Sequence, residues 1–148
     1  MSATAATKPS LTLKRRLDAP PAKVYAAWTD PKKIGQWMGP EGVKTLSAES
    51  DARVGGRYRF VMRSPDGETH DVSGEFREVV ANEKLVFTWG WISTPERVSL
   101  VTVSLKPDGD GTLLTLTHEQ FFDGPARDRH NAGWNSTLDK FEKYLEQA

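Results

Sequence analysis

The sequence predicts one α+β domain, in which an antiparallel sheet with a single apolar face is covered by a long C-terminal helix. The length of 148 residues suits one domain. Residues 42–121 alternate apolar and polar side chains between short turns, which is typical of strands. Residues 130–145 instead have apolar side chains at helical spacing. The domain is expected to span residues 11–146, preceded by a disordered tail over residues 1–10.

The first elements are a strand and two short helices. Residues 11–18 alternate and predict a strand. Asp18 is a candidate N-cap for a helix that follows over residues 20–28, where two prolines suit the first turn. Asp30, followed by a proline, ends this helix, and residues 31–37 predict a second one.

Six strands are expected after the second helix, separated by turns rich in glycine, proline, aspartate and asparagine. Short connections of this kind join neighbouring antiparallel strands, so the region predicts a meander with the first strand of the chain at its edge. The expected strands are residues 43–52, 57–63, 68–80, 84–92, 97–106 and 112–120.

The last helix is expected over residues 130–145, separated from the sheet by the tripeptide that begins at Asp123. One helix face carries the apolar side chains Trp134, Leu138, Phe141 and Leu145. Gly133 interrupts this helix at a cost of roughly 1 kcal/mol relative to alanine. Two interpretations of Gly133 remain: it permits close packing of helix and sheet, or it leaves room for a ligand.

Strand direction predicts where a site lies. In a meander, alternate turns fall at opposite ends of the sheet, and here the longer connections gather at one end. The aromatic strand ends gather there too, and so do Gly133 and the start of the last helix. The aromatic residues concerned are Trp89, Trp91, Phe121 and Phe122.

Three histidines, His70, His118 and His130, are expected to face inward near this end. A shared metal site is not expected, because two strands separate His70 from His118. At ~4.8 Å per strand spacing, their backbones lie about 14 Å apart. The histidines are therefore either structural residues with satisfied hydrogen bonds or groups that orient a polar part of a ligand. If the protein has an acid–base catalyst, His118 and His130 are the candidates.

Composition and motifs exclude several classes of function. Twenty basic residues balance twenty acidic ones, which gives no electrostatic case for nucleic acid or an anionic membrane as a partner. No apolar run is long enough for a membrane span, and the sequence has no cysteine, so a cytoplasmic location is expected. Nucleophile-elbow, phosphate-binding-loop, dinucleotide-binding and zinc-protease motifs do not occur, and no cofactor is expected.

Four segments carry a resemblance to a known family: "DPKKIGQWMGP", "VGGRYRFVMRSPDGETHDVSGEFREVVANEKLVFTW", "GTLLTLTHEQF" and "HNAGWNSTLDKFEKYL". In this order, they resemble the START-like (SRPBCC) superfamily, and within it the family of activator of heat shock protein 90 ATPase homologues. The resemblance implies a helix-grip (START-like, Bet v-like) fold, in which a curved sheet wraps around the long helix and encloses a cavity. The expected ligand-binding wall is Trp37, Met38, Tyr58, Phe60, Met62, Phe76, Trp89, Trp91, His118, His130, Gly133 and Trp134.

Three functions are compatible with this resemblance, because a fold alone does not decide function. The leading hypothesis is a domain that binds a small hydrophobic, aromatic or lipid-like ligand without catalysis. A polyketide cyclase or aromatase-like enzyme is the first alternative, and a co-chaperone-like module that binds a chaperone is the second. The sequence leaves the choice between a monomer and a weak homodimer open.

Overall fold

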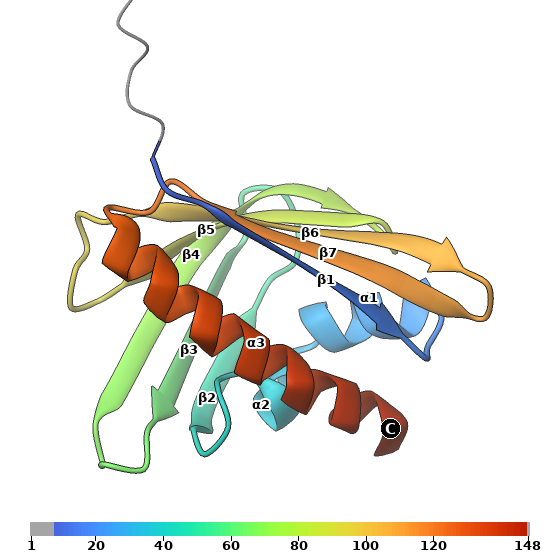
Figure 1. Ribbon diagram of the computed structural model, residues 1–148, viewed down its shortest axis with the longest axis horizontal. Helices are drawn as coiled ribbons and strands as arrows, with labels where there is room; N and C mark the ends of the chain where they lie inside the picture. The colour runs from blue at the N-terminus through green and yellow to red at the C-terminus, as the bar shows by residue number, and fades with distance from the viewer. Residues whose placement is uncertain (1–7, 148) are drawn as a thin grey trace, which may run out of the picture.

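The computed structural model describes residues 8–147 and has the expected α+β helix-grip architecture (Figure 1). A curved sheet of seven antiparallel strands wraps over the long helix α3, and two short helices follow the first strand. The elements are β1 (Leu11–Leu17), α1 (Pro21–Thr29), α2 (Pro31–Trp37), β2 (Lys44–Ser50), β3 (Arg57–Arg63), β4 (Thr69–Val80), β5 (Lys84–Trp91), β6 (Ser99–Asp108), β7 (Gly111–Glu119) and α3 (Gly124–Gln147).

The strand order is β1-β7-β6-β5-β4-β3-β2, so β2 to β7 form a meander and β1 joins its edge beside β7. Leu11 pairs with His118 at one end of this junction, and Leu17 pairs with Thr112 at the other. The predicted meander and the edge position of the first strand are therefore confirmed. The meander follows from short turns, which leave only antiparallel neighbours within reach. The edge position of β1 instead comes from a long-range pairing with β7, the last strand of the chain.

Two helix starts differ from the prediction. Asp18 does not cap α1; it forms an ion pair with Arg16, and α1 has no side-chain cap. Helix α3 begins at Gly124 rather than near residue 130. The Asp123 side chain accepts a hydrogen bond from Ala126 N at 2.8 Å, as an N-cap does. The glycine and proline that follow Asp123 therefore open the helix, because a first-turn proline has no amide hydrogen bond to lose.

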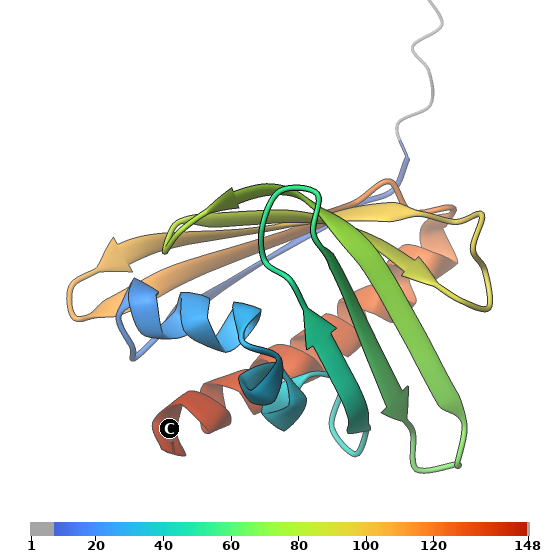
Figure 2. The same cartoon turned by 180° about the vertical axis from the view of Figure 1, so that it is seen from behind.

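Helices α1 and α2 lie on the same side of the sheet as α3 and fill one part of its concave face (Figure 2). Trp28 of α1 and Trp37 of α2 pack together with ring centroids 4.7 Å apart. The ring centroids of Trp37 and Phe141 of α3 lie 4.5 Å apart. Trp37 has no exposed surface, and its Nε1 donates to Ala27 O at 3.1 Å. The C-terminal half of α3 is therefore packed against side chains, and a ligand site must lie further toward its N-terminus.

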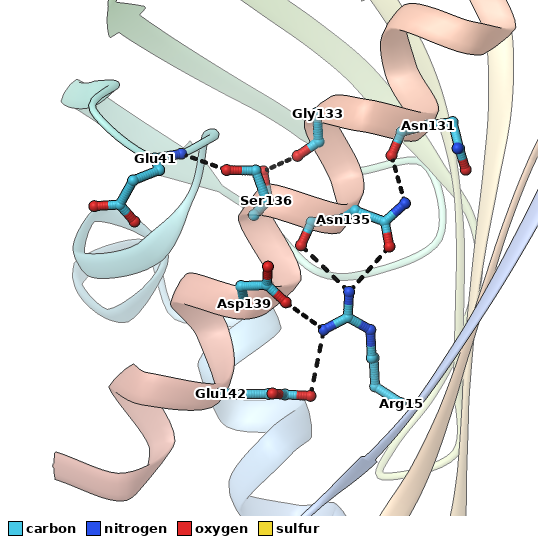
Figure 3. A network of polar contacts seen from close by, with 9 residues as sticks. Arg15, Glu41, Asn131, Gly133, Asn135, Ser136, Asp139 and Glu142 are labelled. Atoms are coloured by element: carbon cyan, nitrogen blue, oxygen red, sulfur yellow. Dashed lines mark hydrogen bonds and ion pairs between the residues drawn. The ribbon is translucent and has the colours of Figure 1, made fainter.

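A polar network fixes α3 to β1 along this packed half (Figure 3). Arg15 of β1 donates to Asp139 Oδ1 at 2.7 Å and to Glu142 Oε1 at 3.4 Å. Its second guanidinium nitrogen reaches the side-chain and backbone oxygens of Asn135 at 3.0 and 3.3 Å. One arginine thus bridges three positions of the helix, which sets the distance between α3 and the sheet edge.

The opposite side of α3 is held to the loop between α2 and β2. Ser136 Oγ accepts a hydrogen bond from Glu41 N at 2.7 Å (Figure 3). Lys140 Nζ donates to the backbone oxygens of Pro40 and Val43 at 3.4 and 3.2 Å. These contacts hold the α2–β2 loop beside the middle of α3, where the loop forms one wall of the site described below.

The N-terminal segment contacts the body of the protein from Pro9 onward. Pro9 O accepts a hydrogen bond from Phe121 N at 3.2 Å, and Ser10 O accepts one from Arg127 at 3.5 Å. The predicted disordered tail over residues 1–10 falls mainly on residues 1–7, which lie outside the described residues. Within residues 8–147, no helix is both long and apolar enough to cross a membrane.

Candidate functional site

A pocket of about 250 Å³ lies between the N-terminal half of α3 and the sheet. We call it the α3 pocket. Its walls come from α3, from the end of β3, from β5 and from the α2–β2 loop. Its lining residues are Met38, Gly39, Pro40, Met62, Trp89, Trp91, Arg129, His130, Gly133, Trp134 and Thr137. Aromatic and aliphatic side chains dominate this lining, as they do in binding sites for small molecules.

Gly133 forms part of the helical wall. A Cβ added at Gly133 would meet only the Pro40 side chain, at 3.7 Å, which is ordinary van der Waals contact. Close approach of the sheet to the helix backbone therefore does not require a glycine here. The position instead leaves open the space between α3 and the α2–β2 loop.

Seven of the twelve residues expected to contact a ligand line the α3 pocket, and five do not. Those that line it are Met38, Met62, Trp89, Trp91, His130, Gly133 and Trp134. Those that do not are Trp37, Tyr58, Phe60, Phe76 and His118, which are buried in the core. The alternation of side chains along the strands predicts that four of these, Tyr58, Phe60, Phe76 and His118, face inward, and they do. It does not predict how deep each one lies, because that depends on the packing of α1 and α2.

Four lining residues were not predicted: Gly39, Pro40, Arg129 and Thr137. A signal was available for the two on the helix, because residues four apart share a helix face. Arg129 lies four positions before Gly133, and Thr137 lies four positions after it. Strand direction also predicts that the junction over residues 37–42 lies at this end of the sheet. It does not predict that Gly39 and Pro40 line the pocket, because this depends on the path of the loop.

A second pocket of about 220 Å³ lies next to the α3 pocket, and we call it the side pocket. Both pockets are lined by Trp89, Trp91, Arg129 and His130. These shared residues form the boundary between the two spaces. The side pocket also contacts the link between β5 and β6 and the start of α3. Its remaining lining residues are Ser93, Thr94, Arg97, Ser99, Phe121, Phe122 and Ala126.

His118 is fully buried, and both of its ring nitrogens are hydrogen bonded. Nδ1 accepts from Trp134 Nε1 at 3.0 Å, since an indole nitrogen can only donate. Nε2 therefore carries the proton and donates to Ser99 Oγ at 2.7 Å, and the Ser99 hydroxyl donates to Trp89 O at 3.2 Å. This chain of bonds joins α3, β7, β6 and β5 behind the α3 pocket.

His130 also has both ring nitrogens engaged. Nε2 accepts from Trp91 Nε1 at 3.0 Å, so Nδ1 carries the proton and donates to Ala126 O at 2.8 Å. Trp91 and His130 are two of the four residues that form the boundary between the α3 pocket and the side pocket. Movement of Trp91 would free the lone pair on His130 Nε2.

Burial keeps both histidines neutral. It lowers the pKa of His118 to about 2, with a smaller contribution from the nearby His130 ring. Burial also lowers the pKa of His130. A general base needs an accessible lone pair, and a general acid needs a proton that it can transfer. In this arrangement neither ring offers one to a ligand in the α3 pocket, so the site as built is suited to binding.

His70 lies apart from the other two histidines. Its Nε2 lies 3.1 Å from Ser64 Oγ at the turn between β3 and β4, and it lines neither pocket. Within residues 8–147, no group of three or more His, Asp or Glu side chains is placed to hold a metal ion.

Comparison with known proteins identifies the family. Residues 18–146 match the family described as "Activator of Hsp90 ATPase homolog 1-like protein". The chain belongs to this family. The match extends from the end of β1 to the last turns of α3, so it includes all the walls of the α3 pocket.

Solved structures of similar proteins share the fold of this member of the Hsp90 ATPase activator homologue family. A protein from Chromobacterium violaceum is 30% identical with a TM-score of 0.85, and the match covers 93% of this chain and 96% of that one. The AHSA1 protein from Silicibacter pomeroyi is also 30% identical with a TM-score of 0.85, covering 94% and 99%. CalU16 from Micromonospora echinospora is 27% identical with a TM-score of 0.72, covering 92% and 75%. Curated proteins give no match.

Proposed function

We propose that this protein binds a small hydrophobic molecule, most suitably an aromatic one, in the α3 pocket. The observation that carries the proposal is an apolar space of about 250 Å³ beside Gly133, the one glycine in the interior of α3. Dry apolar cavities of about 150 Å³ bind benzene-sized ligands, so a space of this size suits a body of one or two rings. A cytoplasmic location accompanies this proposal.

Three tryptophans in the pocket lining support an aromatic ligand. The ring centroids of Trp89 and Trp134 lie 5.1 Å apart, and Trp91 meets Trp89 edge to face at 5.6 Å. Such rings offer both faces and edges, and aromatic contacts are worth about 0.5–1.5 kcal/mol beyond the burial of their area. The Nε1 of Trp89 is buried and has no hydrogen-bond partner within the described residues.

The indole N–H signals of the five tryptophans allow a direct test. In a nitrogen-15 NMR titration with neutral one- and two-ring compounds, including naphthalene-2-carboxamide, binding is expected to shift the signals of Trp89, Trp91 and Trp134. The signal of Trp37, which lines neither pocket, should move least and serves as an internal control. Saturable shifts confined to the pocket signals are the expected result. If no compound moves these signals, or if only Trp37 responds, ligand binding in the α3 pocket is refuted.

The cyclase alternative needs an acid or base that can reach a substrate. His118 and His130 are the candidates. Each donates a hydrogen bond from one ring nitrogen and accepts one at the other, and all four partners are groups of the protein itself. A cyclase would therefore require Trp91 to leave His130 during each turnover. This requirement makes simple binding the better supported function.

The co-chaperone alternative needs an exposed apolar surface. Ile92 and Val98 are 69% and 51% exposed beside Arg57 and Arg59 on the outer side of the sheet, around a depression of about 320 Å³. Charged and polar side chains line this depression together with the apolar ones, so it gives a protein partner less continuous apolar contact than the α3 pocket gives a small ligand. Binding of a small molecule therefore remains the function that the geometry supports best.

A further inference from the structure

The charges around the two pockets restrict what kind of hydrophobic molecule fits. The lining of the α3 pocket contains no acidic residue and one permanent cation, Arg129. The lining of the side pocket also lacks acidic residues and contains Arg129 and Arg97. A ligand that enters either pocket therefore meets a positive charge at the edge of the pocket and no negative charge in the pocket wall.

Arg129 is exposed and makes no hydrogen bond or ion pair with the described residues. The neighbouring carboxylates are engaged elsewhere. Asp128 pairs with Arg127 at 2.8 Å, and Asp123 caps the start of α3 at Ala126 N. The guanidinium of Arg129 is thus left as a free donor fork at the rim of an apolar space. This geometry suits a planar carboxylate, which arginine binds through two parallel hydrogen bonds.

We propose that the ligand is a small aromatic acid, whose one or two rings occupy the α3 pocket and whose carboxylate pairs with Arg129 at the rim. This inference rests on the proposed function, because it names the chemical class of the ligand for the same site. Arg97 supplies a second cation across the side pocket. It is held 3.9 Å above the Phe122 ring and lies 3.9 Å from Glu96, so it is less available than Arg129.

Calorimetric titration with two nearly isosteric probes tests the class. Naphthalene-2-carboxylate is anionic at neutral pH, and naphthalene-2-carboxamide is neutral. At low ionic strength we expect the carboxylate to bind about fivefold more tightly, since one exposed charge pair is worth up to about 1 kcal/mol. High salt should reduce this preference, because mobile ions screen the attraction between the exposed Arg129 and the carboxylate.

Two arginine variants distinguish a local contact from a general effect of charge. Arg129→Gln is expected to remove the preference for the carboxylate, because it lowers the affinity for the carboxylate more than the affinity for the carboxamide. Arg127→Gln is the matched control: it removes one charge from the same helix, but Arg127 lines neither pocket and is paired with Asp128. This variant should retain most of the fivefold preference.

The outcomes separate this inference from the proposed function. Equal binding of the two probes, or a preference that survives in Arg129→Gln, would overturn the assignment of an acid while leaving apolar binding intact. Binding of the carboxamide without binding of the carboxylate would overturn it as well. If neither probe binds and no neutral compound shifts the pocket tryptophan signals, the proposed function fails together with it.

Discussion

Replacing Gly133 with leucine is expected to weaken binding of naphthalene-2-carboxamide at least tenfold while the domain stays folded. The added side chain projects from the helical wall, where the first atom it meets is Pro40 Cγ at 3.7 Å from its Cβ. Because the backbone has room for a Cβ, the leucine can enter the α3 pocket without moving α3. A tenfold loss corresponds to about 1.4 kcal/mol. Calorimetry measures the affinity, and thermal unfolding checks the fold.

Gly133→Ala is the matched control for this experiment. It should raise the free energy of unfolding by up to about 1 kcal/mol, because alanine is the better helix former. For a protein of this size, that corresponds to a rise of about 3 °C in the unfolding midpoint. The methyl group fills little of the pocket, so binding should persist. A marked loss of stability in the alanine variant would show that Gly133 is required for close packing of helix and sheet rather than for an open pocket.

The stability of the protein should fall as the pH is lowered from 7 to 5, and His118 should account for about 2 kcal/mol of the loss. The unfolded chain takes up a proton on this histidine below about pH 6.5. In the folded protein, burial lowers the pKa of His118 to about 2, so the ring stays neutral. Acid therefore favours the unfolded state, and the contribution is constant above about pH 6.5. His130, whose pKa is also lowered by burial, acts in the same direction.

His118→Gln isolates this contribution, because glutamine does not titrate and keeps one donor and one acceptor. At pH 7 the variant should be less stable by about 1–3 kcal/mol, since glutamine cannot reproduce both the Trp134 and the Ser99 bonds. Its stability should depend less steeply on pH than that of the unchanged protein. Urea unfolding between pH 5 and pH 8 measures both quantities. Parallel pH profiles for the two proteins would contradict a buried, neutral His118.

Much of the fold was predictable because strands and turns leave local signals. In β3, for example, Tyr58, Phe60 and Met62 alternate with three arginines, and the three apolar side chains are the buried ones. The start of α3 was not predictable, because the tripeptide that begins at Asp123 resembles a loop in its composition. It forms a capped helix start only because the Asp123 side chain turns back toward Ala126 N. Local composition cannot distinguish these two outcomes.

The candidate site was predictable as a region but not as a list of residues. Strand direction correctly brought Trp89, Trp91 and Gly133 to one pocket. Trp37 was expected beside them, yet it packs between Trp28 and Phe141, because α1 and α2 fill that part of the concave face. Periodicity reports the face on which a side chain lies, whereas the depth of that side chain depends on contacts between distant segments.

A crystal structure with a bound bromine-labelled aromatic compound would show directly whether the α3 pocket is a binding site. The anomalous signal of bromine in 6-bromo-2-naphthol locates the ligand independently of any assumption about its position. We predict a bromine peak inside the α3 pocket, in the space bounded by Trp89, Gly133 and Trp134. A compound bound only on the outer face of the sheet, or a pocket closed by its own side chains at saturating ligand, would contradict ligand binding at this site.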